Sequence, residues 1–480
     1  HPDDVRGKTI LATTVSSSHF ALSHWLRVLG LSDADVVIKN MDQAQALAAF
    51  STGIGTMLLW RSLQGVGTSM LFATNMSLLT LVVPKERRGR AIGWHVAVVY
   101  TGLALGPVLG GLMNYYLGWR SIFLFLAAAS LVAAALSSNP EKSLRAGREL
   151  GLPAERVYAS GLALIEGEKG KENGADVIAI MTPNDSHFEL ASAALAAGFD
   201  VICDKPMTNT VDEAERLHAA VEASGRVFCL THNYTGYPMV RQARGMVEAG
   251  ELGTIRLVQV EYVQGGNAQE SDPSPEQSWR HNPAKGGPSL VMGDIGSHAH
   301  NLLRFITGLE VAEVAAEVGA IVPGRIVHDY AGALLRLSNG ARGSFWVTQA
   351  AAGVENCLRI RVSGTQGTLE WEQEVPQILT FKPASGPAQL RTPNGPGTLP
   401  LAARSSRIVK GHPEGFPEAF ANLYSDAAEA IAARRVGATP DPLALNFPNA
   451  YDGLLGVRFA LAVVQSGAAN GAWVKLEAKV

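Results

Sequence analysis

The chain has 480 residues, enough for two to four domains with large hydrophobic cores. Its net charge of -3 gives no basis for binding nucleic acid. The three cysteines have no CxxC spacing and the histidines between 281 and 300 lack zinc spacing, so neither a disulfide framework nor a metal site is expected.

Residues 1–50 are predicted to alternate strands and helices. Strands are expected in GKTILATT and ADVVIKNM, and Ser16, Ser17 and Ser18 stand where the first helix should begin. Such hydroxyls either cap a helix or help to hold an anion. The segment resembles an inner stretch of periplasmic binding proteins of the taurine/nitrate type. It covers only a fraction of such a protein, so no ligand binding is expected. The opening at His1, without a signal peptide, suggests a fragment, a processed product or an assembled sequence.

A long apolar stretch follows. No charged residue lies between 62 and 84, and Arg120 is the only one between 91 and 138. The basic loop 85–90 separates the two runs. Uncharged apolar runs of about 20 residues can cross a bilayer, and short basic loops stay on its cytoplasmic side. We therefore expect membrane association if residues 62–136 form intact spans.

Four motifs in residues 51–128 resemble the multidrug-antiporter branch of the major facilitator superfamily. They are RSLQGVG at 61–67, PKERRGR at 84–90, GLALGPVLGG at 102–111 and GWR at 118–120. The resemblance covers about three spans, which is too few for the repeats that form a translocation pathway. Transport by this segment is therefore not expected.

From about residue 129, short apolar runs alternate with amphipathic helices. The runs ADVIAIMTP, FDVICDKP and RVFCLTHN are typical of buried strands, so a doubly wound parallel sheet is predicted over 129–235. The left edge of this region stays ambiguous. IFLFLAAASLVAAAL can be the start of a sixth membrane helix, while the later half, SLVAAALSSNPEKS, can equally be a buried parallel strand that leads into a helix.

From Thr254 the pattern changes to long strands of alternating polarity, as in IRLVQVEYVQ and YAGALLRLSNGARGSFWVTQ. Hairpin turns are expected at 338–340 and 365–367, and helices around 414–435 and 449–465. The predicted fold class is therefore an incomplete Rossmann-like α/β sheet, followed over 236–480 by an α+β domain with a large, open, mainly antiparallel sheet.

Two short motifs carry the chemistry. Lys205 follows a strand and precedes Pro206, while Asp294 and His298 are four residues apart and would share one face of an α-helix. A histidine oriented by a carboxylate can remove the proton of an alcohol while a fixed lysine stabilises the charge on its oxygen. Oxidation of an alcohol by a nicotinamide cofactor needs both groups. His300 lies off that face and is expected to be structural.

Several motifs together resemble the Gfo/Idh/MocA family of sugar and polyol dehydrogenases over about 350 residues. They are TPN at 182–184, DKP at 204–206, NY at 233–234, WR at 279–280, D-x-x-x-H at 294–298 and HPEGF at 412–416, with Asp204 in place of that family's glutamate. SSNPEK at 137–142 resembles the end of a dehydrogenase's second strand, which puts the junction near 125–130.

The resemblance implies a cofactor, NAD or NADP, and a sugar or polyol substrate of the inositol type. It implies catalytic roles for Lys205, Asp294 and His298. The cofactor site would comprise Ser137, Ser138, Thr182, Pro183, Asn184, His187, Asp204 and Lys205, and the substrate site Asn233, Tyr234, Trp279, Arg280 and His412. The resemblance also implies a cytoplasmic location for 139–480 and a possible homo-oligomer through the open sheet.

The glycine-rich loop of that family, Gly-x-Gly-x-x-Gly after a first strand, is missing from the sequence. The pairs in 53–55 and 65–67 lack the third glycine, and 102–106 has the wrong spacing. The choice between NAD and NADP stays open, because Ser137 and Ser138 stand where an acidic residue would select NAD. Three hypotheses follow: an oxidoreductase, a membrane protein, or a chimeric chain with no activity as a unit.

Overall fold

The computed structural model describes residues 9–12, 37–40, 134–135, 140–149, 151–270 and 279–476. The chain divides into two compact units, His1–Ile122 and Phe123–Val480. In the first unit, β1 (Thr9–Ala12) and β2 (Val37–Asn40) pair in parallel, which confirms the two strands expected there. Most of the predicted membrane stretch, together with Ser137 and Ser138, lies outside the described residues. No helix within those residues is long and apolar enough to cross a membrane.

The second unit begins with a small parallel pair, β3 (Ala134–Ala135) and β4 (Val157–Tyr158), joined through α7 (Pro140–Glu149) and η3 (Ala154–Arg156). Of the two alternatives for the apolar stretch before residue 137, this arrangement supports the strand that leads into a helix. The next helix, α8 (Gly161–Glu168), ends in the buried carboxylate of Glu168, which pairs with Arg156 and accepts a hydrogen bond from Tyr158. These contacts hold the small layer together.

A second parallel sheet contains β5 (Val177–Ile180), β6 (Asp200–Cys203) and β7 (Phe228–Leu230), in that order. The helices α9 (His187–Ala197) and α10 (Val211–Ser224) connect its strands. Every residue of β6 is buried, as expected for a central strand of a parallel sheet. A capping box formed by Thr210 and Glu213 begins α10.

The two parallel sheets are separate pieces of one predicted doubly wound sheet. In the usual strand order of such folds, 3-2-1-4-5-6, the first strand lies between the second and the fourth. Here β3 pairs with β4, and β5 pairs with β6, but no strand within the described residues bridges β3 and β5. The split falls where the sequence lacks the strand that would carry the glycine-rich loop.

The large sheet has nine strands in the order β15-β14-β13-β12-β8-β11-β10-β9-β16. Their bounds are β8 (Ile255–Val263), β9 (Val311–Gly319), β10 (Tyr330–Leu337), β11 (Arg342–Thr348), β12 (Cys357–Gly364), β13 (Gly367–Glu372), β14 (Leu379–Pro383), β15 (Gln389–Arg391) and β16 (Val474–Lys475). Only β8 and β11 pair in parallel, so the prediction of a mainly antiparallel sheet is confirmed. Gly340, at φ +86°, makes the predicted turn between β10 and β11.

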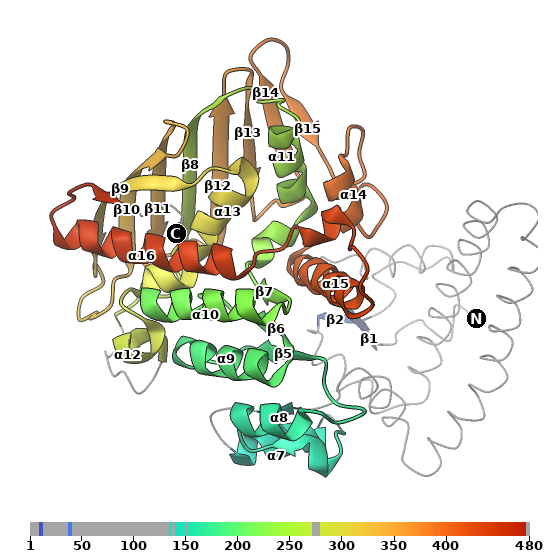
Figure 1. The fold of residues 1–480 in the computed structure, drawn as a ribbon. Coiled ribbons are helices and arrows are strands. Elements are labelled where there is room, and N and C mark those ends of the chain that lie inside the picture. Colours follow the sequence, from blue (N-terminus) through green and yellow to red (C-terminus); the bar gives the residue numbers. More distant parts are fainter. Residues whose placement is uncertain are drawn as a thin grey trace, which may run out of the picture. The chain divides into compact units, whose positions relative to one another are not determined.

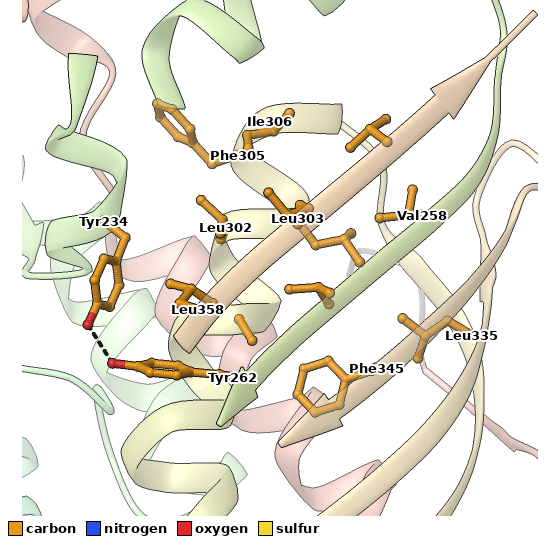
Figure 2. Close-up of a cluster of buried hydrophobic side chains, with 14 of the residues drawn as sticks. Tyr234, Val258, Tyr262, Leu302, Leu303, Phe305, Ile306, Leu335, Phe345 and Leu358 are labelled. Carbon is orange, nitrogen blue, oxygen red and sulfur yellow. Dashed lines mark hydrogen bonds between the residues drawn. The ribbon is translucent and has the colours of Figure 1, made fainter. Parts of the chain in front are cut away.

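Helices cover one face of this sheet and leave the other open within the described residues (Figure 1). The covering helices are α11 (Pro238–Glu248), α13 (Ser297–Thr307) and α16 (Ala450–Ala468). Figure 2 shows the resulting core, where Leu302 and Leu303 of α13 meet Val258, Leu335 and Phe345 of the sheet. Because α16 contacts both β9 and α10, it joins the large sheet to the layer beneath it.

The remaining elements surround the junction of these layers. They are η4 (Asn184–Ser186), η5 (Asn233–Gly236), η6 (Trp279–His281), α12 (Pro283–Gly286), the π-helix η7 (Met292–Gly296), α14 (Pro400–Ser405), α15 (Phe416–Arg435) and η8 (Pro442–Leu445). Both predicted C-terminal helices are confirmed, as α15 and α16, with ends a few residues from the expected ones.

Candidate active site

The candidate site lies at the carboxyl ends of β5, β6 and β7. Parallel strands end at the same edge of a sheet, so the residues that follow them are brought together. The segment 182–184 follows β5, Asp204 and Lys205 follow β6, and the segment 231–233 follows β7. This edge faces the π-helix η7, from which Asp294 projects, and the start of α13, which carries His298.

Lys205 and Asp294 form a hydrogen-bonded ion pair. Lys205 Nζ donates to Asp294 Oδ1 at 2.9 Å and also to the backbone carbonyl of Asp294. The second carboxylate oxygen, Oδ2, accepts from Gln349 Nε2 at 2.7 Å. Burial raises the pKa of Asp294, but the charge of Lys205 and the hydrogen bonds from Lys205 and Gln349 outweigh it, so the pKa lies below its ordinary value. Asp294 is therefore a fixed anion that holds the ammonium group.

The expectation that Asp294 orients His298 needs correction. Residues Met292–Gly296 form a π-helix, in which the amide of Ser297 bonds to the carbonyl of Met292, five residues back. The wider turn ends the four-residue periodicity that would align the two side chains. Within the described residues, the Asp294 carboxylate accepts hydrogen bonds from Lys205 and Gln349, whereas His298 Nδ1 is hydrogen-bonded to His232 Nδ1.

His298 and His232 form a buried pair. Their Nδ1 atoms are 3.3 Å apart, and the rings meet edge to face at 5.2 Å between centroids. Burial, the charge of Lys205 and the neighbouring His232 hold the pKa of His298 well below its ordinary value. Burial, Lys205 and Arg304 lower the pKa of His232 to about 3. Both imidazoles are therefore neutral at pH 7, and a neutral His298 can accept a proton.

A cavity of about 570 Å³ opens beside these groups. Its lining is rich in hydroxyl and amide side chains and includes Asp204, Lys205, Thr231, Asn233, Tyr234, Tyr262, Gln264, Asp294, Ile295, His298, Asn356, Gln373, Phe416 and Phe420. The hydroxyls of Tyr234 and Tyr262 bond to each other (Figure 2), and Tyr262 also donates to Asn356 at 2.9 Å. Asn233 Nδ2 is buried and has no hydrogen-bond partner within the described structure. Such groups suit a ligand with several hydroxyls.

Seven predicted site residues within the described part of the chain do not line this cavity: Thr182, Pro183, Asn184, His187, Trp279, Arg280 and His412. His187 is fully buried, with its ring nitrogens 2.8 Å from the carbonyl of Pro206 and 2.9 Å from that of Thr182, so it is not available to a cofactor. It instead ties the end of β5 to the turn that carries Lys205. His412 is exposed, and its Nδ1 lies 3.3 Å from the carbonyl of Val409 in its own loop.

Trp279 does not line the cavity; it packs beneath the guanidinium of Arg280. Arg280 itself approaches the site, with Nε 3.8 Å from Asp294 Oδ1. His300 stacks on Phe459 with ring centroids 4.3 Å apart, which confirms its predicted structural role. Asn184 donates to the carbonyl of Gly286 and so attaches α12 to the end of β5.

Several residues of the site were missed in the sequence. They are His232, Tyr262, Gln264, Gln349, Asn356, Gln373 and Phe420. Most come from strands of the large sheet or the loops between them, far along the chain from Lys205. The available signal was weak: polar residues such as Gln264 and Gln349 directly follow strands whose last two residues are buried.

Comparison with known proteins gives three family matches. The model of the GFO/IDH/MocA C-terminal domain matches residues 240–370, and that of the oxidoreductase family with an NAD-binding Rossmann fold matches 120–232. The model of the Major Facilitator Superfamily matches 44–171. The last two matches overlap over residues 120–171, and within that overlap α7, β4 and α8 belong to the parallel layer described above.

Relatives match most of the second unit. An uncharacterized oxidoreductase of Bacillus subtilis, YfiI, is 32% identical over 73% of this chain and 90% of that protein. A crystal structure of an oxidoreductase from Sinorhizobium meliloti is 45% identical, with a TM-score of 0.66 over 73% of this chain and 95% of that one. An inositol dehydrogenase homolog from Azotobacter vinelandii, complexed with NADH and myo-inositol, is 33% identical, with a TM-score of 0.67 over 74% of this chain and 93% of that one.

Proposed function

Since the chain belongs to the Gfo/Idh/MocA family of oxidoreductases, whose cofactor is NAD or NADP, we propose that it oxidises a secondary alcohol of a sugar or polyol. The observation that carries the proposal is one cavity in which a fixed ammonium group, Lys205, and a neutral imidazole, His298, stand among hydroxyl and amide side chains. The polyol-bound relative from Azotobacter vinelandii supports the substrate class.

In the proposed reaction, His298 takes the proton of the substrate hydroxyl. Lys205 donates a hydrogen bond to the same oxygen and stabilises the negative charge that develops on it. Asp294 keeps the ammonium of Lys205 in place, and Gln349 keeps Asp294 in place. Asn233 and Asn356 bind the other hydroxyls of the substrate. When bound, the nicotinamide supplies the hydride acceptor.

The residues present fit the nicotinamide end of the cofactor. Thr182 and Pro183 are only partly buried, and they lie at the strand end next to the turn of Lys205, so they can contact the nicotinamide ribose there. The pyrophosphate end is different. The sequence has no glycine-rich loop, and the sheet is split between β3 and β5, where that loop would start. We therefore propose weak cofactor binding, with residues 129–235 as the nucleotide-binding part and 236–480 as the substrate-binding part.

Cofactor binding is tested by titrating the full chain with NADH and NADPH while nicotinamide fluorescence is followed. Binding at millimolar concentration or tighter is expected. Its absence with both nucleotides would show that this chain is not an active dehydrogenase. The chimeric alternative, in which residues 44–171 are a transporter fragment and the chain has no activity, would then stand.

The roles of the two proposed catalytic groups are tested with Lys205→Ala and His298→Ala. Each is expected to lower turnover of polyols by about 100-fold or more, since loss of a general base or of one charge stabiliser has that effect. Lys410→Ala, an exposed lysine, and His218→Ala, a histidine of α10, are the matched controls and should leave turnover unchanged. Unchanged rates in Lys205→Ala or His298→Ala would refute the assigned role.

We also propose that the open face of the large sheet forms a homo-oligomer. Leu257, Leu334 and Trp346 are exposed on neighbouring strands of this face, at 58%, 59% and 42%. Arginines and glutamates of the adjacent strands form ion pairs beside them, such as Arg361–Glu370 at 2.7 Å. An apolar centre with a charged rim is typical of a protein–protein interface.

A further inference from the structure

We propose that His232 is a positioning residue that fixes the tautomer of His298, so that Nε2 of His298 is the proton-accepting atom. The inference rests on the proposed function, because it concerns the base of that reaction. His232 is only 2% exposed and does not line the cavity, whereas His298 does. His232 therefore acts on the substrate only through His298.

The hydrogen bond between the two rings has only two possible directions. A neutral imidazole carries one proton, so one Nδ1 must donate and the other must accept. If His232 donated, His298 would hold its own proton on Nε2, the nitrogen left for the cavity, and could not act as a base there. If His298 donates, its Nε2 keeps a free lone pair.

Proton transfer selects between the two directions. When His298 accepts a proton at Nε2, both of its nitrogens carry hydrogen. Its Nδ1–H still donates to the lone pair on His232 Nδ1 if His232 was already the acceptor. In the opposite direction, two N–H groups would face each other at 3.3 Å, in the interior, with no acceptor between them. The hydrogen bond is therefore compatible with both neutral and protonated His298 only if His298 is the donor and His232 the acceptor.

His232 supplies this acceptor without adding charge. The charges of Lys205 and Arg304 act on the pair, the carboxyl groups of Asp204 and Asp294 line the same cavity as His298, and the phenols of Tyr234 and Tyr262 pack around His298. Asp294 is hydrogen-bonded to Lys205 and Gln349, and within the described residues no carboxylate is hydrogen-bonded to either imidazole. A neutral acceptor orients His298 but does not stabilise its imidazolium as a carboxylate would.

The tautomer is observed directly by 15N NMR of the full chain labelled at its histidines, with His298 assigned from the signals lost in His298→Asn. A protonated Nδ1 and an unprotonated Nε2 in His298 are expected at neutral pH. Protonation of Nε2 instead would overturn the proposal. This measurement needs neither cofactor nor turnover, so it decides the tautomer even if no polyol is oxidised and the proposed function fails.

Three substitutions at His232 separate positioning from packing. His232→Asn places an amide oxygen near the former Nδ1 and should keep turnover within about tenfold of the parent. His232→Leu has comparable bulk but no acceptor, and should lower kcat about 100-fold or more while KM changes little, as loss of a correctly held base does. His232→Asp is nearly isosteric with Asn but charged, and should move the acidic limb of kcat/KM to higher pH by raising the pKa of His298.

Loss of turnover through misfolding must be distinguished from a result that refutes the role of His232. Thermal unfolding identifies any variant that has lost its fold, and the Asn and Asp pair serves for comparison if the Leu variant does not fold. If folded His232→Leu stays within threefold of the parent in kcat, His232 only packs. An acidic limb that is the same in the Asn and Asp variants would also refute a hydrogen bond between His232 and His298.

Discussion

At the scale of single residues, the site combines one fixed ion pair with neutral, buried histidines. Lys205 and Asp294 neutralise each other, and the buried imidazoles of His232 and His298 stay neutral at pH 7. Burial lowers the pKa of His232, His298 and His300 below the ordinary value of 6.5. The native state therefore resists taking up protons that the unfolded chain accepts.

We therefore predict that the free energy of unfolding decreases as the pH is lowered. Above pH 6.5 these histidines are neutral in both states, and their full contribution to the stability is present. As the pH falls below 6.5 the unfolded state binds protons that the native state does not, so the free energy of unfolding decreases by up to about 1.4 kcal/mol per pH unit for each such histidine. Urea midpoints at pH 7.5, 6.5 and 5.5 measure the effect, and His300→Asn should reduce the slope. Midpoints independent of pH would contradict the assignment.

The sequence identified Lys205 and His298 because each stands in a short, distinctive motif. His232 was overlooked, because its role depends on a contact across 66 positions with another histidine. His187 was assigned to the cofactor on its motif alone, whereas its burial between two carbonyl groups gives it a structural task. Roles that depend on which groups face each other cannot be obtained from spacing along the chain.

At the scale of elements, α16 positions the turn that carries Lys205. A methyl group added at Gly453 would lie 2.6 Å from Met207 Sδ and 2.8 Å from Met207 Cβ. Met207 is fully buried two residues after Lys205. The absence of a side chain at Gly453 thus lets the helix pack closely against this turn.

Gly453→Ala is therefore expected to destabilise the protein by about 1–3 kcal/mol, as overpacking of a core does, and to lower turnover by shifting Lys205. Gly456→Ala is the matched control on the same helix, where an added methyl meets nothing within 4 Å. The control should stabilise the protein by about 0.5–1 kcal/mol through helix propensity alone. Chemical denaturation of both variants gives the comparison, and equal stability of the two would show that Gly453 does not pack tightly.

Most elements could be predicted because periodicity marks them. Alternating polarity identified β8, β10 and β11, and Gly340 marked a hairpin turn. The π-helix could not be predicted, because one wider turn leaves no signature in the short sequence MGDIG. Because an α-helix was assumed, Asp294 was predicted to orient His298, whereas in the structure it forms an ion pair with Lys205.

At the scale of the whole molecule, the open face of the large sheet predicts self-association. Changing Leu334 and Trp346 together to arginine should convert an oligomer to a monomer, because the apolar centre of the interface would become charged. Size-exclusion chromatography with light scattering measures the state. Val436→Arg, at a 78% exposed apolar residue at the end of α15, is the control and should not change it. An equal molar mass for the parent and the double variant would show that this face of the sheet is not the interface of an oligomer.

The split between the parallel sheets makes a prediction about the cofactor. Insertion of a strand–Gly-x-Gly-x-x-Gly–helix segment ahead of residue 134 should tighten NADH binding by about tenfold or more, since backbone amides at a helix N-terminus would then reach the pyrophosphate. Fluorescence titration measures the affinity. The same segment with its first two glycines changed to valine is the control, and equal affinity of both insertions would show that the missing loop is not what limits binding.

The π-helix has a consequence for how such a site can change over time. One extra residue in a turn rotates everything that follows it, so a carboxylate and an imidazole that an α-helix would couple become independent parts. Asp294 holds Lys205, and His298 has its own neutral partner, His232. Substitutions at His232 can therefore change the basicity of His298 without breaking the ion pair of Lys205 and Asp294, whereas the charge of Lys205 still lowers the pKa of His298. The pKa of His298 and the position of Lys205 can therefore be changed by substitutions at different residues.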